Sequence, residues 1–451
     1  MDTEQKETVE LGTEPTDRFE KKQYIAVTIM LVLLAILVTF VITYAALTSS
    51  YNDYIDEMES EYQNRLDLLG DFSTIAELYK ALPKELQNIE MLERLAYIDI
   101  YYRANYVGKI DEEKLIYGLA NGYIAGVGDQ YGGYYTADEF KSIMSDTAGN
   151  TVGIGVYITS DGNMQAIRIS YVMKDGPANK VGLLPGDLIT HVGGVSISEL
   201  GYYSAIEAIK GEEGTEIELT YLRGEQSHTV MLKRAKVQVE SVIYTKHQTQ
   251  ENTGVIRIIE FNDATTEQFI SAVKTAVGTD GCTTIVFDLR SNTGGTLGSV
   301  VAMLDFLLPK GELVTIRYAD GTTTTHYSDD EGEELEALYG NNVKMAVLTN
   351  GYTASAAELF TCALKDYGVA KIVGEKTFGK GCGQNVIPLS DGTGLIFTTF
   401  LYDPPISENY NGVGIVPDVT AHLSEEASSK NLFELSHDED DQLKAALEAL
   451  K

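Results

Sequence analysis

The sequence predicts an α/β core, a smaller strand-rich domain before it, helices ahead of both, and one membrane-spanning helix near the N-terminus. Three observations support this prediction: an uncharged apolar run over 24–47, short alternating apolar runs over 150–238, and an alternation of strands and helices from Gly254 onward. Alternating strands and helices are typical of α/β layers, and short runs bounded by Gly, Asp and Asn are typical of strands. The 451 residues are enough for two or three such domains.

The apolar run near the N-terminus predicts a membrane anchor. No charged residue stands between Lys22 and Asp53. At about 1.5 Å per residue, a helix over 24–47 is long enough to cross a bilayer. The polar stretch 1–23 before it is longer than the lead-in of a cleaved signal peptide, so we expect an uncleaved signal anchor. Basic residues precede the span and acidic residues follow it, which predicts a cytoplasmic N-terminus and an extracytoplasmic body in the cell membrane.

Residues 48–145 are predicted to form a helical stalk and an N-terminal cap. Ile55, Met58, Tyr62 and Leu66 recur at helical spacing. The composition then changes near Asn150, where the compact strand-rich domain over 150–238 begins. Its strands are expected at Gly155–Ile158, Ala166–Ile169, Asp187–Val192, Glu216–Leu222 and Thr229–Leu232, with one helix at Tyr203–Ile209.

The α/β core is expected over 239–425, followed by a C-terminal tail helix within 426–451. Continuous apolar runs predict its buried strands, and helical spacing predicts its helices. The strands are expected at Gly254–Ile259, Thr284–Leu289 and Lys344–Leu348, and the helices at Glu267–Val277, Gly298–Leu307, Ala354–Leu364 and Asp440–Leu450.

Charge and cysteine content exclude several classes of protein. The formal net charge is −33, which argues against nucleic acid and against anionic headgroups as partners of the folded body. The three cysteines, Cys282, Cys362 and Cys382, form no C-x-x-C pair. Neither a disulfide framework nor a metal site is therefore expected, and no cofactor is predicted.

A serine stands where a buried strand gives way to a helix. Ser355 lies in the segment Asn-Gly-Tyr-Thr-Ala-Ser-Ala-Ala-Glu, which follows the strand that ends at Leu348. The free N–H groups at a helix N-terminus favour negative charge and could stabilise a tetrahedral oxyanion. The alternative is that Ser355 or Thr353 is only a helix N-cap, a common role for both residue types.

A lysine stands between two glycines in the segment Gly-Glu-Lys-Thr-Phe-Gly-Lys-Gly-Cys-Gly-Gln. Lysine is a poor base at its ordinary pKa of about 10.4, but burial beside apolar groups lowers that pKa and makes a usable general base. Phe378 is a candidate for the apolar neighbour of Lys380. The alternative is a surface lysine in a glycine turn.

The segment Asp-Leu-Arg-Ser-Asn-Thr-Gly-Gly at 288–295 follows another buried strand. Paired glycines before a helix can point bare N–H groups at one anion, although a plain turn has the same residues. A phosphate loop would need Gly-Lys-Ser/Thr, which is absent. None of the six histidines lies in these three segments; spacing does not exclude a Ser-His-Asp triad, but a lysine base is favoured.

Together, the three segments resemble the carboxyl-terminal processing peptidases, also called tail-specific proteases. The family's serine and lysine motifs correspond to Thr353–Glu358 and Thr377–Gln384, and the resemblance extends over roughly 85–450. It implies a crotonase/ClpP-like catalytic core with an inserted PDZ domain, and a serine endopeptidase. The residues that match the family's functional positions are Ser355 as nucleophile, Lys380 as base, Gln384 as the residue that orients the lysine, Gly294 or Gly295 with the N–H of Ala356 as oxyanion hole, and Asp366 as a supporting residue.

The resemblance also implies a partner. Gly153–Val156 and Gly182–Ile189 are similar to the PDZ domain of the family. The N–H groups around Gly153 and Gly155 would receive the C-terminal carboxylate of a protein or peptide substrate, and Ile154 and Val156 would line a pocket for its last side chain. Homo-oligomerisation is left open.

Two departures from the family pattern occur, at Gly383, where an apolar residue is common, and after the strand that precedes Pro405. The first would loosen the lysine loop, and the second would alter local substrate contacts. Two other classes remain as alternatives. One is an inactive, membrane-anchored PDZ scaffold, and the other is a core related to acyl-CoA hydratases, which lacks support because no acid pair replaces the serine and lysine.

Overall fold

The computed structural model describes residues 89–160, 164–328 and 342–451. The chain divides into two compact units, Met1–Ile110 and Asp111–Lys451. The described part of the first unit is 89–110, which contains helix α3 (Ile89–Asn105). The predicted span at 24–47 and the helical pattern at 55–66 lie outside the described residues. Within the described ranges, no helix combines the length and the apolar character that a membrane span requires.

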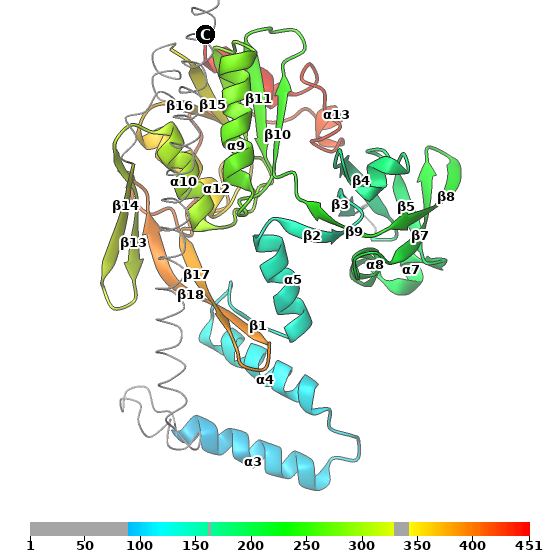
Figure 1. Ribbon diagram of the computed structural model, residues 1–451. Helices are drawn as coiled ribbons and strands as arrows, with labels where there is room; N and C mark the ends of the chain where they lie inside the picture. Colours follow the sequence, from blue (N-terminus) through cyan, green and yellow to red (C-terminus); the bar gives the residue numbers. More distant parts are fainter. Residues whose placement is uncertain (1–88, 161–163, 329–341) are drawn as a thin grey trace, which may run out of the picture. The chain divides into compact units, whose positions relative to one another are not determined.

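The core of the second unit is a six-stranded sheet with the strand order β10-β11-β12-β15-β16-β19 (Figure 1). Strands β11 to β19 are parallel, and β10 is the antiparallel edge. The bounds are Val242–Lys246 for β10, Thr253–Ile258 for β11, Thr284–Asp288 for β12, Lys344–Thr349 for β15, Ala370–Gly374 for β16 and Val419–Thr420 for β19.

Helices cover this sheet on both faces, which explains why its strands read as continuous apolar runs. Helices α9 (Thr265–Lys274), α10 (Leu297–Leu307) and α12 (Ala356–Asp366) share one core cluster with Ile256, Phe287 and Val347, among other strand residues. The intervening strand residues point to the other face and pack against α14 (Asp441–Ala449); this second cluster includes Val255, Val286, Ala346, Leu443 and Leu447. The strand–helix alternation predicted for the core is thus confirmed within a few residues at each end.

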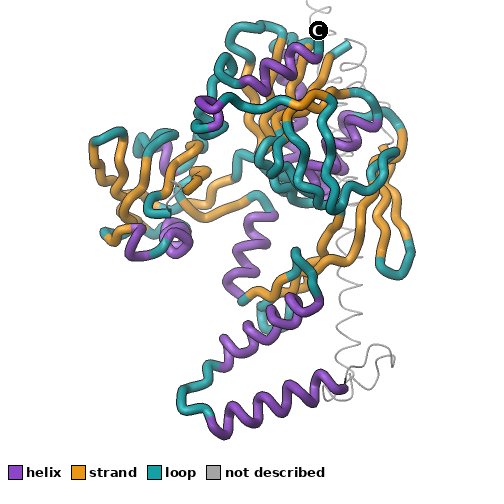
Figure 2. The backbone as a smooth tube through the Cα atoms, turned by 180° about the vertical axis from the view of Figure 1, so that it is seen from behind, coloured by secondary structure: helices purple, strands orange, loops and turns teal. Residues whose placement is uncertain are grey.

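A second sheet of five strands was not predicted. Its order is β1-β18-β13-β14, and β17 also pairs with β18. The strands are β1 (Gly133–Tyr135), β13 (Gly311–Tyr318), β14 (Thr323–Ser328), β17 (Cys382–Pro388) and β18 (Gly394–Asp403). Helices α4 (Glu112–Val127) and α5 (Ala137–Thr147) flank β1, which joins the long β17–β18 hairpin (Figure 2). The segment predicted as a helical stalk and cap therefore contains one strand, and that strand belongs to the sheet of the lysine segment.

The strand-rich domain has its own core around Ile167, Ile189 and Leu219. Strands β2 (Asn150–Gly153) and β9 (Ala235–Gln238) pair with each other at its two ends. Between them lie β3 (Val156–Ser160), β4 (Ile167–Val172), β5 (Leu188–Val192), β6 (Val195–Ser196), β7 (Glu216–Arg223) and β8 (Gln226–Lys233), with α6 (Pro177–Lys180), α7 (Ile197–Leu200) and α8 (Tyr202–Ile209). All five predicted strands and the predicted helix are present.

Candidate active site

Ser355 lies at the N-cap of α12, just beyond the carboxyl end of β15. Its φ of 57° and ψ of −122° are rare for a residue with a side chain, and such conformations typically cost about 1–3 kcal/mol. A sharp strand-to-helix turn of this kind exposes a side-chain oxygen at the end of a sheet. Ser355 is thus both a helix N-cap residue and a serine held in a strained turn, so the two interpretations of the sequence do not exclude each other.

A buried glutamate joins the serine segment to the lysine segment. Glu358 is 0% exposed. Its Oε2 accepts hydrogen bonds from the N–H of Ser355 (2.9 Å) and of Lys380 (2.7 Å), and its Oε1 accepts from the N–H of Gly379 (2.7 Å) and from the Thr377 hydroxyl (2.5 Å). Burial raises the pKa of Glu358, while these hydrogen bonds oppose that effect. The carboxylate therefore fixes the main chain of both motifs with neutral donors alone.

Lys380 is half-buried, and its ammonium group has no carboxylate within ion-pair distance among the residues that the structure describes. Nζ donates to Oε1 of Gln384 at 2.9 Å and lies 4.4 Å from the centre of the Tyr131 ring. Burial lowers the pKa of Lys380, which favours the neutral amine. Phe378, the candidate apolar neighbour from the sequence, is 55% exposed, whereas the aromatic ring found in contact with Nζ is that of Tyr131, which the sequence did not suggest.

Tyr402 from β18 completes the contacts of Ser355 and was missed by the sequence reasoning. Its hydroxyl lies 3.2 Å from Oγ of Ser355 and 2.7 Å from the carbonyl oxygen of Lys380. Within the described ranges, no hydrogen bond joins Ser355 Oγ to Lys380 Nζ directly. The tyrosine could not be found from spacing, because it comes from the second sheet, which the sequence did not predict.

The glycine pair at 294–295 lies directly against the serine turn. A Cβ atom on Gly294 would be 2.7 Å from Cβ of Ser355, and one on Gly295 would be 1.9 Å from the carbonyl oxygen of Phe261. The N–H of Gly294 donates to Oδ1 of Asn292 at 2.8 Å. No hydrogen bond is found for the N–H of Gly295 or of Ala356 within the described part of the chain. The N–H groups of Gly295 and Ala356 are therefore available to bind an anion beside Ser355.

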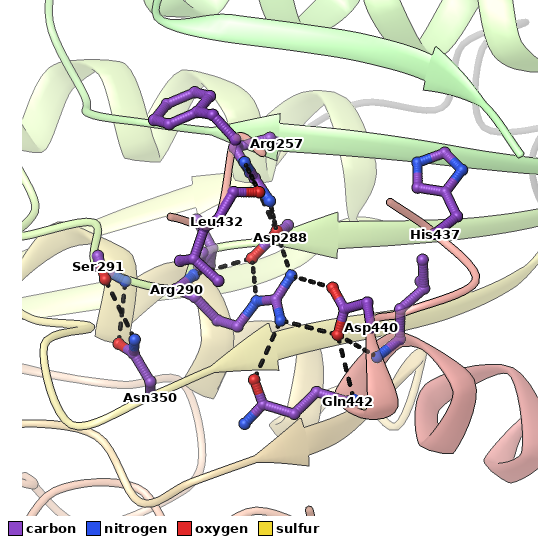
Figure 3. Close-up of polar contacts among 12 residues, drawn as sticks. Arg257, Asp288, Arg290, Ser291, Asn350, Leu432, His437, Asp440 and Gln442 are labelled. Atoms are coloured by element: carbon purple, nitrogen blue, oxygen red, sulfur yellow. Dashed lines mark hydrogen bonds and ion pairs between the residues drawn. The ribbon is translucent and has the colours of Figure 1, made fainter. Parts of the chain in front are cut away.

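The remainder of the 288–295 segment has a structural role (Figure 3). Asp288 and Arg290 are buried at 0% and 5% exposure. Arg290 forms ion pairs with Asp288 (2.7 Å) and with Asp440 (2.6 Å), the N-cap of α14, and Arg257 forms a further pair with Asp288 (2.7 Å). The side chain of Asn350 bonds the backbone and hydroxyl of Ser291. This network fixes the start of the glycine loop against the C-terminal helix.

Asp366 does not lie at the reactive groups. It is at the C-terminal end of α12, where its carboxylate accepts from the backbone N–H groups of Ile406 and Ser407. Over the eleven positions from Ser355 to Asp366, a helix rises by about 16 Å. The supporting role that the resemblance implied stays a prediction; the hydrogen bonds of Asp366 are to the loop after β18.

Of the four residues implied in peptide binding, Ile154 is 2% exposed and packs in the core cluster of the strand-rich domain. Gly153 ends β2, Gly155 has a φ of 75° and lies against Gly176, and Val156 begins β3 and is partly buried. The side chain of Ile154 is thus a core residue of the domain, and the peptide-binding role of the four stays a prediction.

The departure at Gly383 has a packing explanation. A Cβ atom there would lie 2.1 Å from the Phe400 ring, which packs across the β17–β18 pair. A glycine is required for this close approach. The ring of Phe400 thus occupies the space of the missing side chain, and the expectation of a loosened lysine loop stays a prediction.

The fold and the site define the class of the protein. Residues 252–421 match the model of peptidase family S41, and residues 168–223 match a PDZ domain model. The chain is 35% identical over 351 residues to a protein of Staphylococcus haemolyticus described as a probable CtpA-like serine protease, covering 78% of this chain and 67% of that protein. It is 36% identical to a protein of the same description from Staphylococcus saprophyticus, covering 71% of this chain and 62% of that protein.

The chain therefore belongs to the S41 family of serine-type peptidases, the C-terminal processing proteases, and contains a PDZ domain. A crystal structure described as an S41 protease from Bacteroides fragilis has the same fold, with a TM-score of 0.51 and 18% sequence identity, covering 76% of this chain and 90% of that one. The family predicted from the serine, lysine and glycine motifs is confirmed.

Proposed function

We propose that the chain is an endopeptidase in which Ser355 is the nucleophile and Lys380 the general base. The main support for this proposal is that one oxygen atom, Oε2 of Glu358, accepts hydrogen bonds from the backbone N–H groups of both Ser355 (2.9 Å) and Lys380 (2.7 Å). Because one oxygen atom binds both backbones, the side chains of Ser355 and Lys380 extend from neighbouring positions in the main chain. Glu358 binds the backbone of Lys380 and forms no ion pair with its ammonium group.

In the proposed reaction, neutral Lys380 Nζ takes the proton of Ser355 Oγ as that oxygen attacks the carbonyl carbon of the scissile peptide bond. The ammonium then gives this proton to the leaving amine, and a water molecule hydrolyses the acyl-enzyme by the same route. The Ser355–Lys380 hydrogen bond is expected to form in the substrate complex, since such bonds are often absent or long before substrate binds.

The oxyanion of the tetrahedral intermediate would lie between the N–H groups of Gly295 and Ala356. The N–H of Gly294 is occupied by Asn292, so Gly294 contributes space instead of a donor. Its missing side chain lets the loop approach Ser355. The N-terminus of α12 adds its dipole to the two donors, in support of negative charge at this point.

Recognition of substrate C-termini is proposed for the PDZ domain. PDZ domains bind an extended peptide beside a strand and receive its terminal carboxylate on backbone N–H groups. The segment Gly153–Val156 is the candidate, as the sequence indicates. Protein or peptide substrates with an apolar last residue would be favoured, because burying a charged side chain without a partner is costly.

A membrane anchor over 24–47, with the body extracytoplasmic, is proposed from the sequence alone. The substrates would then be extracytoplasmic proteins. Protease added to intact cells without an outer barrier should digest the body and leave the cytoplasmic tail; a body protected from digestion would reverse the proposed topology.

The catalytic assignment is tested with an unfolded model protein and with the variants Ser355→Ala and Lys380→Ala. Each variant should remove cleavage while the melting temperature stays near that of the unchanged chain, since nucleophile and base act as one unit. Cleavage by folded Ser355→Ala would refute the assignment. An unchanged chain that leaves every substrate intact would support the inactive scaffold instead.

A further inference from the structure

A chain of hydrogen bonds leads away from the lysine to a loop that lies far from it in sequence. Lys380 Nζ donates to Oε1 of Gln384 (2.9 Å), and Nε2 of Gln384 donates to the hydroxyl oxygen of Thr398 (3.3 Å). Gln384 and Thr398 are cross-strand partners in β17 and β18, so their side chains share one face of the sheet. The Thr398 hydroxyl donates in turn to Oδ1 of Asp129 (2.8 Å).

Asp129 is held firmly in this position. Its Oδ2 also accepts the backbone N–H of Thr398 at 2.8 Å, and its Oδ1 accepts that of Tyr131 at 3.1 Å. Burial opposes ionisation of Asp129, but its hydrogen bonds, those from Thr398 first, outweigh burial and lower the pKa of the carboxyl group. The loop of Asp129 continues into β1, which pairs with β18. The carboxylate is therefore ionised and can only accept hydrogen bonds.

The charge of Asp129 determines which way the amide of Gln384 faces. The single proton of the Thr398 hydroxyl goes to the carboxylate, so its oxygen offers a lone pair to Gln384. Gln384 must then present its NH₂ group to Thr398 and its oxygen to Lys380. With that oxygen holding one N–H of Lys380, the lone pair of the neutral amine stays free. An amide turned the other way would place an NH₂ group against the amine.

We propose, on the basis of the proposed function, that Asp129 is a positioning residue that fixes the direction of the Gln384 amide through Thr398 and thereby orients Lys380 as the base. Tyr131, from the same loop, supports this arrangement because its ring lies 4.4 Å from Lys380 Nζ. The loop at 129–131 thus contributes two residues to the surroundings of the lysine: a ring in contact with it and a carboxylate that acts through three successive hydrogen bonds.

The test compares Asp129→Asn and Thr398→Val with Thr398→Ser in the full-length chain. Asparagine can donate to Thr398 and so permits the turned amide, and valine removes the hydroxyl at almost constant size. Asp129→Asn and Thr398→Val should each lower kcat for a fluorogenic peptide at least about tenfold with KM nearly unchanged. Thr398→Ser, which keeps the hydroxyl, should retain most of the rate of the unchanged chain. A matched control is Asp391→Asn, because Asp391 accepts the N–H and hydroxyl of Thr393 in the turn of the same hairpin.

The pH profile separates positioning from a general loss of structure. Burial lowers the pKa of Lys380, whereas Cys382, Asp129 and Glu358 raise it, and the phenol of Tyr131 is a further titratable group that faces Nζ. Asp129→Asn should therefore move the acidic limb of the kcat profile to lower pH, and Thr398→Val, which keeps the charge, should lower the plateau with a smaller shift.

Three outcomes decide the matter. Rates within about twofold of the unchanged chain for both variants, with Ser355→Ala inactive, would overturn the positioning role and leave the proposed function intact. Activity in Ser355→Ala would overturn the proposed function itself. If Asp129→Asn fails to fold, as judged by its melting curve, Thr398→Val decides, because it keeps the backbone hydrogen bond to Asp129 and changes only the hydroxyl.

Discussion

Two carboxylates, Glu358 and Asp288, are each 0% exposed in the same catalytic core, yet they are satisfied in opposite ways. Asp288 is paired with the guanidinium groups of Arg290 and Arg257. Glu358 has only N–H and hydroxyl donors around it. Arginine pairs fix the scaffold behind the glycine loop. Neutral donors fix the reactive segments without adding a cation beside Lys380.

The difference follows from what each region has to do. A structural network can contain buried charges as long as each is paired with an opposite charge. Burial opposes ionisation of Asp288, but the charges of Arg290 and Arg257 outweigh burial and lower its pKa. A general base has to lose its proton near neutral pH, so a carboxylate paired with the ammonium group would be harmful. Glu358 instead binds the main chain of Lys380 and leaves its amine to Gln384.

The largest expected effect is that of Glu358→Gln. The new NH₂ group would face backbone N–H groups that have lost their acceptor, and each such buried group typically costs about 1–3 kcal/mol. We expect peptidase activity to fall at least about 100-fold and the melting temperature to drop. Steady-state kinetics and thermal melts measure both. If Glu358→Gln keeps full activity, the glutamate does not join the two motifs in the way described.

Gly294→Ala tests whether the glycine loop must approach Ser355 closely for activity. Its Cβ would lie 2.7 Å from Cβ of Ser355, at a φ of 102°, so either the loop or the serine must move. We expect a loss of about 100-fold in kcat. The matched control is Gly298→Ala in α10, where a Cβ meets nothing within 4 Å. That change, in the first turn of α10, should leave the melting temperature and kcat close to those of the unchanged chain.

Arg290→Met is expected to lower the stability of the fold without changing the reactivity of Ser355. Removing one partner of a buried ion pair typically costs about 3–5 kcal/mol, because the other charge stays buried. Denaturant unfolding should show that loss. At a temperature where the variant remains folded, Ser355 should still react with a fluorophosphonate at a rate within about threefold of the unchanged chain. Loss of reactivity in folded protein would give Arg290 a direct part in the site.

The smallest effect concerns acid stability. Because the folded-state pKa of Asp288 lies below its unfolded value, its contribution to stability is present above about pH 4 and is lost as the pH falls through the folded-state value. The part of the stability that Asp288 provides should therefore be constant from pH 7 to about pH 5 and decline below about pH 4, which is measured as the difference in melting temperature between the unchanged chain and Asp288→Asn. Asp288→Asn should flatten the acid limb. An unchanged acid limb in that variant would assign it to other carboxylates.

The sequence predicted the strands and helices of the α/β core and the strand-rich domain, because buried strands read as continuous apolar runs and helices and half-buried strands have periodic patterns. It also predicted Ser355, Lys380 and Gln384 as a group, and the structure brings Gln384 to the lysine at 2.9 Å. Their catalytic roles remain proposals. The choice between Gly294 and Gly295 needed the structure, since only the contact with Asn292 removes one of the two donors.

The sequence did not predict the second sheet or the residues that it brings to the site. Strands β17 and β18 are partly exposed on both faces and lack a clear alternation. Tyr402 reaches Ser355 across 47 positions, and Asp129 reaches Thr398 across 269. Contacts between segments so far apart leave no spacing signal in a single sequence, and the environment of Lys380 could not be derived from its neighbours in the chain.

The most direct test of the Ser355–Lys380 assignment is the rate at which a fluorophosphonate labels Ser355 as a function of pH, in the unchanged chain and in Lys380→Met. Burial lowers the pKa of Lys380, so the rate should rise with pH to a plateau, with a midpoint below the ordinary pKa of lysine. Lys380→Met should lose this rise and most of the rate while remaining folded. An identical profile in Lys380→Met would contradict the assignment of Lys380 as the base.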